Sequence, residues 1–304
     1  MTEHRETADE YDLKQCGRCA AWIPRTATMC AACGSTSPDK RIDSRPARSP
    51  LGLPPYVTAT RVLIAVNLTY FVFSVWAQLR VAPRTPLAAL LIEGDNFSAG
   101  LVRAGWYDHA RVVSGEWWRV LAATFLHGGV FHLAVNMYSL HQLGPFAEEL
   151  FGAAKFLAIY LICGACSALA ISVWFVGVQH LPPQHVPPMV GASGAIFGIA
   201  GLLTAFLLRR GSARGRAIGM QLAQNLGLMI LIGLMIPYIS NTGHVGGAVP
   251  GILFGLTVRE AFSTQLSPES RRNWWLVATL AAVAAIVALG SGIAFTVHNL
   301  GAPR

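Results

Sequence analysis

The sequence predicts an all-α protein that crosses a membrane several times, and three observations support this fold class. Hydrophobic residues make up 53% of the 304 residues and charged residues only 12%, which is about half the charged share of an ordinary soluble domain. After residue 56 the chain contains repeated apolar runs, and about 20 apolar residues suffice to cross a bilayer. The Lys and Arg residues gather in the N-terminal region and in connecting loops. We therefore expect a polytopic membrane protein.

The first 34 residues are hydrophilic and contain two CxxC pairs, which predict a small zinc-ribbon-like segment. Each pair supplies two thiolates from one tight turn, and zinc is held by four ligands in a tetrahedral arrangement. Zinc would also supply the folding free energy that so short a segment does not gain from a core. Two disulfides or a redox CxxC are the alternatives. The predicted ligands are Cys16, Cys19, Cys30 and Cys33, and a Pro-rich linker is expected over residues 35–56.

Seven apolar segments are predicted to be transmembrane helices. A long connection over residues 80–118 separates the first from the second, and its Trp106, Trp117 and Trp118 suit a position at the membrane interface. The predicted spans cover residues 57–79, 127–147, 154–178, 191–208, 217–238, 243–258 and 274–297.

The charges of the short loops predict the orientation. The loops after the fourth and sixth spans are rich in Arg, whereas residues 179–190 and 239–243 contain no Lys or Arg. By the positive-inside rule, the basic loops and the N-terminal region are cytoplasmic, although the Arg residues of the connection 80–118 fit this rule poorly. The N-terminal cysteines would then be in a reducing compartment, which favours zinc over disulfides. The net charge of +8 is therefore a topology signal, and no nucleic-acid partner is expected.

Polar side chains on three of the spans are expected at one depth. Ser193, His244 and His132 each lie fifteen or sixteen residues before a charged residue at the inner end of their span. At a rise of 1.5 Å per residue, each is about 22 to 24 Å above that charged residue. Asn136 follows His132 by four residues and shares its helix face. Because polar groups are costly against lipid, we expect these four to face one another or a water-filled cavity.

A serine and a histidine placed together indicate nucleophilic catalysis. His244 would act as general base on Ser193 and then give a proton to the leaving amine. The Asn136 amide, a His132 N–H and the Ser193 backbone N–H are suitable donors to an oxyanion. No Asp or Glu lies in the apolar interiors to orient His244, so we expect a dyad. The chain also lacks paired Asp in its spans, HExxH and GxSxG, the motifs of intramembrane aspartyl proteases, zinc proteases and α/β-hydrolases.

Together these motifs resemble the rhomboid family of intramembrane serine proteases. The resemblance covers about residues 56–260 and implies a six-helix catalytic core over residues 57–260, followed by a loop and a seventh transmembrane helix in residues 261–304. It implies that Ser193 is the nucleophile, His244 the base, and His132 and Asn136 the oxyanion donors. The structural motif residues of the resemblance are Trp118, Arg119, His127, Glu148, Gly191, Gly194, Gly247 and Gly251.

The resemblance also implies that the connection 80–118 is half-sunk in the outer leaflet and that the fifth span acts as a lateral gate. Gly247 and Gly251, spaced as GxxxG, would let the sixth span approach the fourth closely. Three amides in the fifth span are interpreted as helix-to-helix hydrogen bonds, with a substrate site as the alternative; they are Gln221, Gln224 and Asn225.

We therefore expect an intramembrane serine endopeptidase that cleaves transmembrane protein substrates near the outer membrane face through an acyl-enzyme. The alternative is a non-catalytic rhomboid-like scaffold that binds client helices. The expected location is a bacterial plasma membrane, with a cytoplasmic N-terminus and an active site that opens to the outer side. Catalysis is expected to need no cofactor, and the zinc at the N-terminal cysteines is expected to be structural.

Overall fold

The computed structural model describes residues 13–16, 22–24, 26–30, 36, 58–91, 98–210, 213–236, 239–258 and 268–300. Almost all of the expected linker over residues 35–56 lies outside these ranges. The chain divides into two compact units, one comprising Met1–Val57 and Ser212–Arg214 and the other comprising Thr58–Gly211 and Gly215–Arg304.

The N-terminal unit contains a short antiparallel hairpin. Strand β1, Leu13–Gln15, pairs with β2, Trp22–Pro24, so that Lys14 lies opposite Ile23. Cys16 follows β1 directly and is buried with Ile23 and Cys30 in a small cluster. The hairpin therefore brings the first cysteine of each CxxC pair into one buried cluster.

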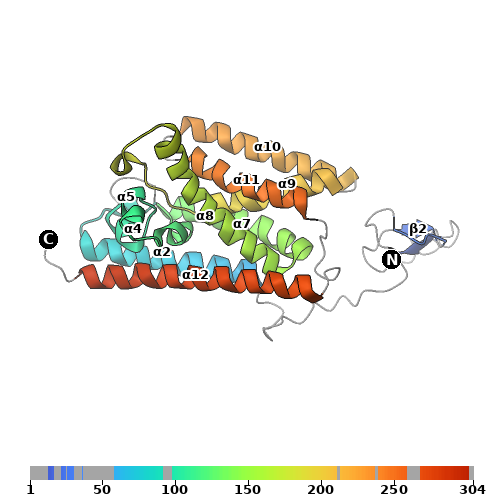
Figure 1. Ribbon diagram of the computed structural model, residues 1–304, viewed down its shortest axis with the longest axis horizontal. Helices are drawn as coiled ribbons and strands as arrows, with labels where there is room; N and C mark the ends of the chain where they lie inside the picture. The colour runs from blue at the N-terminus through green and yellow to red at the C-terminus, as the bar shows by residue number, and fades with distance from the viewer. Residues whose placement is uncertain are drawn as a thin grey trace. The chain divides into compact units, whose positions relative to one another are not determined.

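The second unit is a bundle of long helices (Figure 1). Short helices form the connection that follows α2: α3 Leu87–Leu91, α4 Ser98–Ala104, α5 His109–Val113 and α6 Arg119–Ala122, which continues into the 3-10 turn η2 Ala123–Phe125. Two further short elements are the π-helical η3 Val173–Val178, which extends α8, and the 3-10 turn η4 Pro183–His185. The long helices are α2 Ala59–Val81, α7 Val130–Phe151, α8 Ala153–Ser172, α9 Ser193–Arg210, α10 Ala213–Met235, α11 Asn241–Thr257 and α12 Pro268–Leu300.

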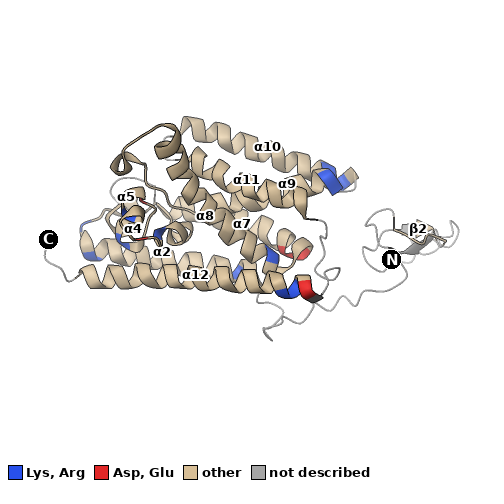
Figure 2. Ribbon diagram, in the orientation of Figure 1, with Lys and Arg blue, Asp and Glu red and all other residues tan. Residues whose placement is uncertain are grey.

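The lengths and composition of these helices confirm an all-α polytopic membrane protein. Among the described residues, five helices are long and apolar enough to cross a bilayer, and Arg119–Phe125 with Val130–Phe151 adds a sixth if this bent pair is one span. Charged side chains lie mainly near helix ends and in the connection between α2 and α7 (Figure 2). The helix α11, predicted as the sixth span, has only 17 residues.

The second predicted span differs from the structure at its start. The prediction begins it at residue 127, whereas α7 begins at Val130, after a bend of 88° from the preceding helical segment. Gly129 precedes α7 in an extended conformation with φ 177°. The consecutive glycines Gly128 and Gly129 favour a break in the helix because glycine loses more conformational freedom than other residues when it becomes helical.

Helix α9 lies at the centre of the bundle and packs against α11, α8 and α7. Its contact with α11 is made by glycines. A Cβ added at Gly247 would overlap the backbone of Gly194, and one added at Gly251 would overlap the backbone of Gly198. Because no side chain separates them there, the two helix backbones lie in direct contact.

Helix α10 is far less buried and lies at the edge of the bundle (Figure 1). Its only fully buried residues are Gly219 and Gly233. Gly219 lies against Leu207 and Leu208 at the end of α9, and Gly233 lies against Asn241 at the start of α11. The Asn241 side-chain amide also donates a hydrogen bond of 3.1 Å to the carbonyl oxygen of Ile230. The described contacts of α10 with the bundle are thus made by Gly219 and Leu222 in its first half and by Ile230 and Gly233 in its second half.

Candidate active site

Ser193 is the first residue of α9, and the chain that leads into it is held in a fixed conformation. Gly191 has φ +125°, which a residue with a side chain rarely adopts. Its backbone N–H donates a hydrogen bond of 2.9 Å to the carbonyl oxygen of Ala123. A Cβ at Gly191 would lie only 2.8 Å from His132 Nε2, so the glycine also makes room for that imidazole.

His244 lies in the first turn of α11 and meets Ser193 across the glycine contact. Its Nε2 is 3.0 Å from Ser193 Oγ, which is hydrogen-bond distance. Ser240 caps α11 by accepting a hydrogen bond of 3.1 Å from the Gly243 N–H. The close approach of α9 and α11 therefore places the predicted nucleophile and the predicted base in contact.

Phe197 holds the ring of His244 from one side. The two rings stack with centroids 4.1 Å apart and an interplanar angle of 7°. Phe197 follows Ser193 by four residues and therefore lies on the same face of α9. Phe197 is not among the predicted site residues, although its spacing from Ser193 is visible in the sequence.

His132 and Asn136 lie in the first two turns of α7. His132 Nδ1 is 3.5 Å from the Gly128 backbone nitrogen, and its ring meets that of buried His127 edge-on at 5.2 Å between centroids. The Asn136 amide donates a hydrogen bond of 3.0 Å to the carbonyl oxygen of His132. His132 thus lies beside Gly191, which is two residues before Ser193, whereas one Asn136 amide hydrogen is used within its own helix.

Glu148 and Arg119 each join segments that are far apart along the chain. The Glu148 carboxylate accepts hydrogen bonds of 2.9 and 3.1 Å from the Ala59 and Thr60 N–H groups at the start of α2. The fully buried Arg119 pairs with Glu116 at 2.6 Å and donates to the carbonyl oxygens of Val102 and Trp106. Both side chains therefore satisfy backbone groups at places where the chain changes direction.

Trp118 and the connection between α2 and α7 contact the C-terminal half of α12. The Trp118 ring leaves no room for a Cβ at Gly105, which has φ +109°, and its centroid is 5.8 Å from that of Phe295. Thr296 donates a hydrogen bond of 3.0 Å to the carbonyl oxygen of Arg103. Helix α12, predicted as the seventh span, is therefore packed against this connection.

The same connection is tied to the loop before Ser193, a contact that the sequence analysis missed. Tyr107 and Met189 exchange two backbone hydrogen bonds of 2.9 and 3.1 Å, as in an antiparallel bridge. The Tyr107 hydroxyl also bonds to Ser172 Oγ, which lies 2.6 Å from His109 Nδ1. Burial raises the pKa of Tyr107, and the bond to Ser172 acts in the opposite direction. The structure thus contains a second serine–histidine contact outside the predicted dyad.

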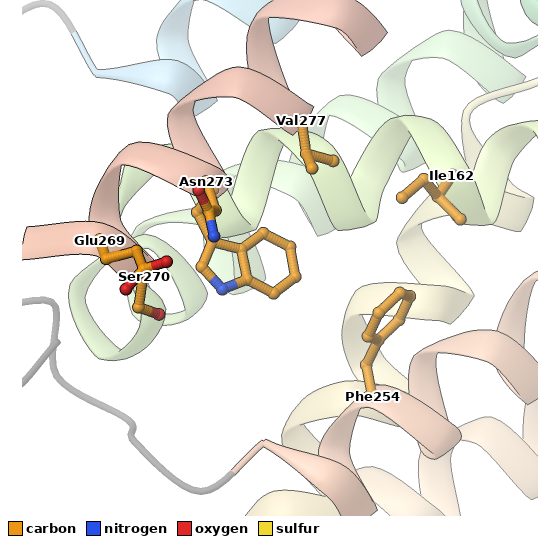
Figure 3. Close-up of a pocket in the computed structure, with 7 residues that line it drawn as sticks. Ile162, Phe254, Glu269, Ser270, Asn273 and Val277 are labelled. Carbon is orange, nitrogen blue, oxygen red and sulfur yellow. The ribbon is translucent and has the colours of Figure 1, made fainter. Parts of the chain in front are cut away.

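A cleft of about 470 Å³ lies elsewhere, between α8, α11 and α12 (Figure 3). Its lining includes none of the predicted site residues. Phe254, the lining residue on α11, is ten residues after His244 and therefore about 15 Å farther along the helix. The complete lining is Ile162, Phe254, Glu269, Ser270, Asn273, Trp274 and Val277.

Two of the four predicted zinc ligands are described. Cys16 and Cys30 are 2% and 0% exposed, respectively, and share one cluster, whereas Cys19 and Cys33 lie outside the described residues. In the part of the chain that the structure describes, no three His, Cys, Asp or Glu side chains form a group suited to a metal ion. Two buried thiols near each other fit half of a tetrahedral thiolate site.

Comparison with known proteins places the chain in a family. The family model described as a Rhomboid domain matches residues 114–261. Rhomboid protease GluP of Bacillus subtilis is 33% identical over 177 residues, which are 57% of this chain but only 33% of GluP. Rhomboid protease AarA of Providencia stuartii is 28% identical over 53% of this chain and 63% of its own length. YdcA of Bacillus subtilis, provisionally named a rhomboid protease, is 31% identical over 142 residues, 47% of this chain and 67% of YdcA. The chain therefore belongs to the rhomboid family.

Proposed function

We propose that this protein is an intramembrane serine endopeptidase that cleaves transmembrane protein substrates near the outer membrane face. The observation that carries the proposal is the 3.0 Å contact between His244 Nε2 and Ser193 Oγ. Relatives that are named rhomboid proteases support the same chemistry. A serine that contacts an imidazole inside a membrane bundle is suited to acyl transfer.

The reaction would begin with proton transfer from Ser193 to His244. Nε2 must then be the unprotonated ring nitrogen, so the Nδ1 position carries the proton. Ser193 Oγ attacks the carbonyl carbon of the scissile peptide, and His244 gives the proton to the departing amine, leaving an ester on Ser193. Water that loses a proton to His244 attacks this ester, which releases a carboxylic acid and restores the serine. Stacking on Phe197 would orient the imidazole without a carboxylate partner.

The oxyanion of the tetrahedral intermediate would be bound beside Gly191. Candidate donors are the His132 Nε2–H and the second amide hydrogen of Asn136, together with the backbone N–H of Ser193. Such donors stabilise charge that develops in the transition state and are most effective where water is excluded. A Cβ at Gly191 would lie 2.8 Å from His132 Nε2 and 3.5 Å from Ser193 Oγ, so this imidazole lies close to the proposed nucleophile, which supports the assignment.

The substrate would be a transmembrane helix that unwinds locally to present a peptide bond. Residues such as Gly or Pro near the cleaved bond would ease unwinding because they weaken a helix. The small buried surface of α10 supports its role as the gate through which the substrate enters from the bilayer. We place the protein in a bacterial plasma membrane, with its N-terminus in the cytoplasm.

A fluorophosphonate serine probe tests the activity without a known substrate. We expect one adduct per protein by intact mass, and none on Ser193→Ala. Ser172→Ala is the matched control, because Ser172 also contacts a histidine and should leave labelling unchanged. A folded wild type that the probe does not label, and that binds a transmembrane substrate without cleaving it, would contradict the proposal. This result would favour a non-catalytic scaffold.

For the N-terminal unit we propose a structural zinc ion held by Cys16, Cys19, Cys30 and Cys33. The burial of Cys16 and Cys30 in one cluster supports it. The purified full-length protein should contain one zinc per chain by elemental analysis, and a Cys16→Ser, Cys19→Ser variant should contain none. Metal-free wild type would refute the site, independently of the outcome for Ser193.

A further inference from the structure

Three amide side chains on α10 are exposed and have no hydrogen bond to any residue that the structure describes. They are Gln221, Gln224 and Asn225, and they lie near the middle of the 23-residue helix. An amide in the hydrocarbon layer needs a hydrogen-bonding partner, because neither lipid tails nor bulk water supply one there. The sequence alone suggested that these amides join helices within the bundle, but the structure gives them no such partner.

The direction of these amides follows from helix geometry. Gly219 and Gly233 are buried against the bundle, and Leu222 packs on its core. At about 100° per residue, Gln224, Gln221 and Asn225 are rotated about 140°, 200° and 240° from Gly219. Gln221 and Gln224 therefore point away from the bundle, on the face of α10 that is opposite its own packing surface, and Asn225 lies at the flank of that face, about 60° from Leu222.

Several polar side chains that lie within the described spans have partners in the bundle. Asn67 donates to the carbonyl oxygen of Leu63 at 2.7 Å, and Tyr70 donates to that of Ala104 at 2.7 Å. Asn241 donates to the carbonyl oxygen of Ile230 at 3.1 Å. The α10 amide face, defined as Gln221, Gln224 and Asn225, thus differs from these buried polar groups in lacking a partner within its own bundle.

We propose that the α10 amide face binds the same face of a second copy of this chain. An amide is both a donor and an acceptor, so identical faces are complementary to each other. Two copies inserted in the same direction carry these amides at the same depth, and an axis normal to the membrane then brings them together. Exposed Ala217 and Leu228 extend the face by one turn on either side, and the small Ala217 permits close approach.

A substrate helix suits this face less well. The amide face points away from the bundle that contains Ser193 and His244, so a helix bound there would be separated from both by α10 itself. A second copy needs no such access. The proposal therefore does not depend on the proposed protease activity.

Energy transfer between labelled copies tests the association. Full-length protein carrying donor or acceptor dye on an appended C-terminal tag is reconstituted together in phosphatidylcholine vesicles over a range of protein-to-lipid ratios. We expect saturable energy transfer for the wild type. The variant Gln221→Leu, Gln224→Leu, Asn225→Leu should require at least about tenfold higher protein density, given the modest strength of each interhelical hydrogen bond.

Thr279→Leu is the matched control, since it makes an exposed residue of α12 apolar, and it should associate as the wild type does. Gln224→Asn retains an amide and should also associate. Circular dichroism melting shows whether the triple variant is folded, and Gln221→Leu alone, expected to weaken association by a smaller factor, replaces it if it is not. A wild type that stays monomeric at every ratio overturns the proposal and leaves the face to a helix of another protein. Equal association of the folded triple variant also overturns it.

Discussion

The α9–α11 contact and helix α10 represent two ways of holding a helix in one bundle. At the α9–α11 contact, Gly247 and Gly251 leave no space for even a methyl group. In the most apolar 18-residue stretch of α10, only 6% of the residues are buried. A Cβ added at Gly227 of this helix would have no atom within 4 Å. Helices α9 and α10 both contact α11. The two contacts differ because α9 meets α11 through closely packed glycines, whereas α10 meets it at few residues.

The two kinds of packing suit two different needs, the positioning of Ser193 against His244 and the access of a substrate. Ser193 and His244 belong to different helices, and a hydrogen bond of 3.0 Å between them requires that those helices be fixed to within a fraction of an ångström. Under the proposed function, a substrate helix would instead need an element that moves at small cost. Close glycine packing supplies the first property, and the sparse contacts of α10 suit the second.

The largest effect is expected from removing the imidazole of His244, which the α9–α11 contact positions. His244→Ala should abolish cleavage of a transmembrane substrate, because His244 Nε2 is the ring nitrogen at hydrogen-bond distance from Ser193 Oγ. A gel-based cleavage assay in vesicles measures the rate, and an unchanged melting temperature shows that the fold is retained. Residual cleavage at more than a small fraction of the wild-type rate would show that the contact is not the catalytic one.

Asn136→Ala should lower the cleavage rate by about 10² to 10³, the usual effect of losing one oxyanion donor. The Asn136 amide already donates one hydrogen bond to the carbonyl oxygen of His132. Asn136→Asp keeps the size of the side chain but lacks the amide hydrogens, so it separates hydrogen-bond donation from packing. Single-turnover rates measure the effect on the chemical step. A rate within threefold of wild type for Asn136→Ala would remove this residue from the proposed oxyanion site.

Gly247→Ala should lower the free energy of unfolding by about 1 to 3 kcal/mol, as expected for overpacking, because its Cβ would overlap the backbone of Gly194. It should also separate His244 from Ser193 and slow labelling by a serine probe. Denaturant titration in detergent measures the stability. An unaffected protein would mean that the two helices slide apart easily, contrary to the contrast with α10.

The smallest expected effect is on the other side of the comparison. Gly227→Ala should raise the free energy of unfolding by up to about 1 kcal/mol, because alanine favours a helix more than glycine does and the added methyl group meets no atom. The same denaturant titration compares it with Gly247→Ala. Destabilisation by Gly227→Ala would show that α10 packs more closely than the structure indicates.

Most of the fold was predictable from hydropathy alone. The fourth span was expected over residues 191–208, and the helix is Ser193–Arg210. The seventh was expected over residues 274–297 and lies within Pro268–Leu300. The 88° bend before Val130 was missed because apolar composition carries no information on chain direction.

The candidate site was predictable only where residues are related by depth or helix face. Counting residues predicted that Ser193 and His244 lie together, and the structure brings them into contact; their catalytic roles remain a prediction. The Tyr107–Met189 bridge joins residues 82 positions apart through backbone atoms, which leave no signature in side-chain types. Phe197 resembles any other apolar residue of a span until the ring of His244 is placed beside it.

The length of α11 has a consequence for the surrounding lipid. A helix of 17 residues is about 25 Å long, whereas a typical hydrocarbon layer is about 30 Å thick. If α11 is the sixth span, as predicted, the bilayer beside it would thin, or the headgroups and their water would reach toward one end of the helix. His244 is the fourth residue of α11, so at that end a thinned bilayer would shorten the path by which water reaches the imidazole in the proposed reaction. The chain length of the surrounding lipids thus becomes a determinant of how wet this site is.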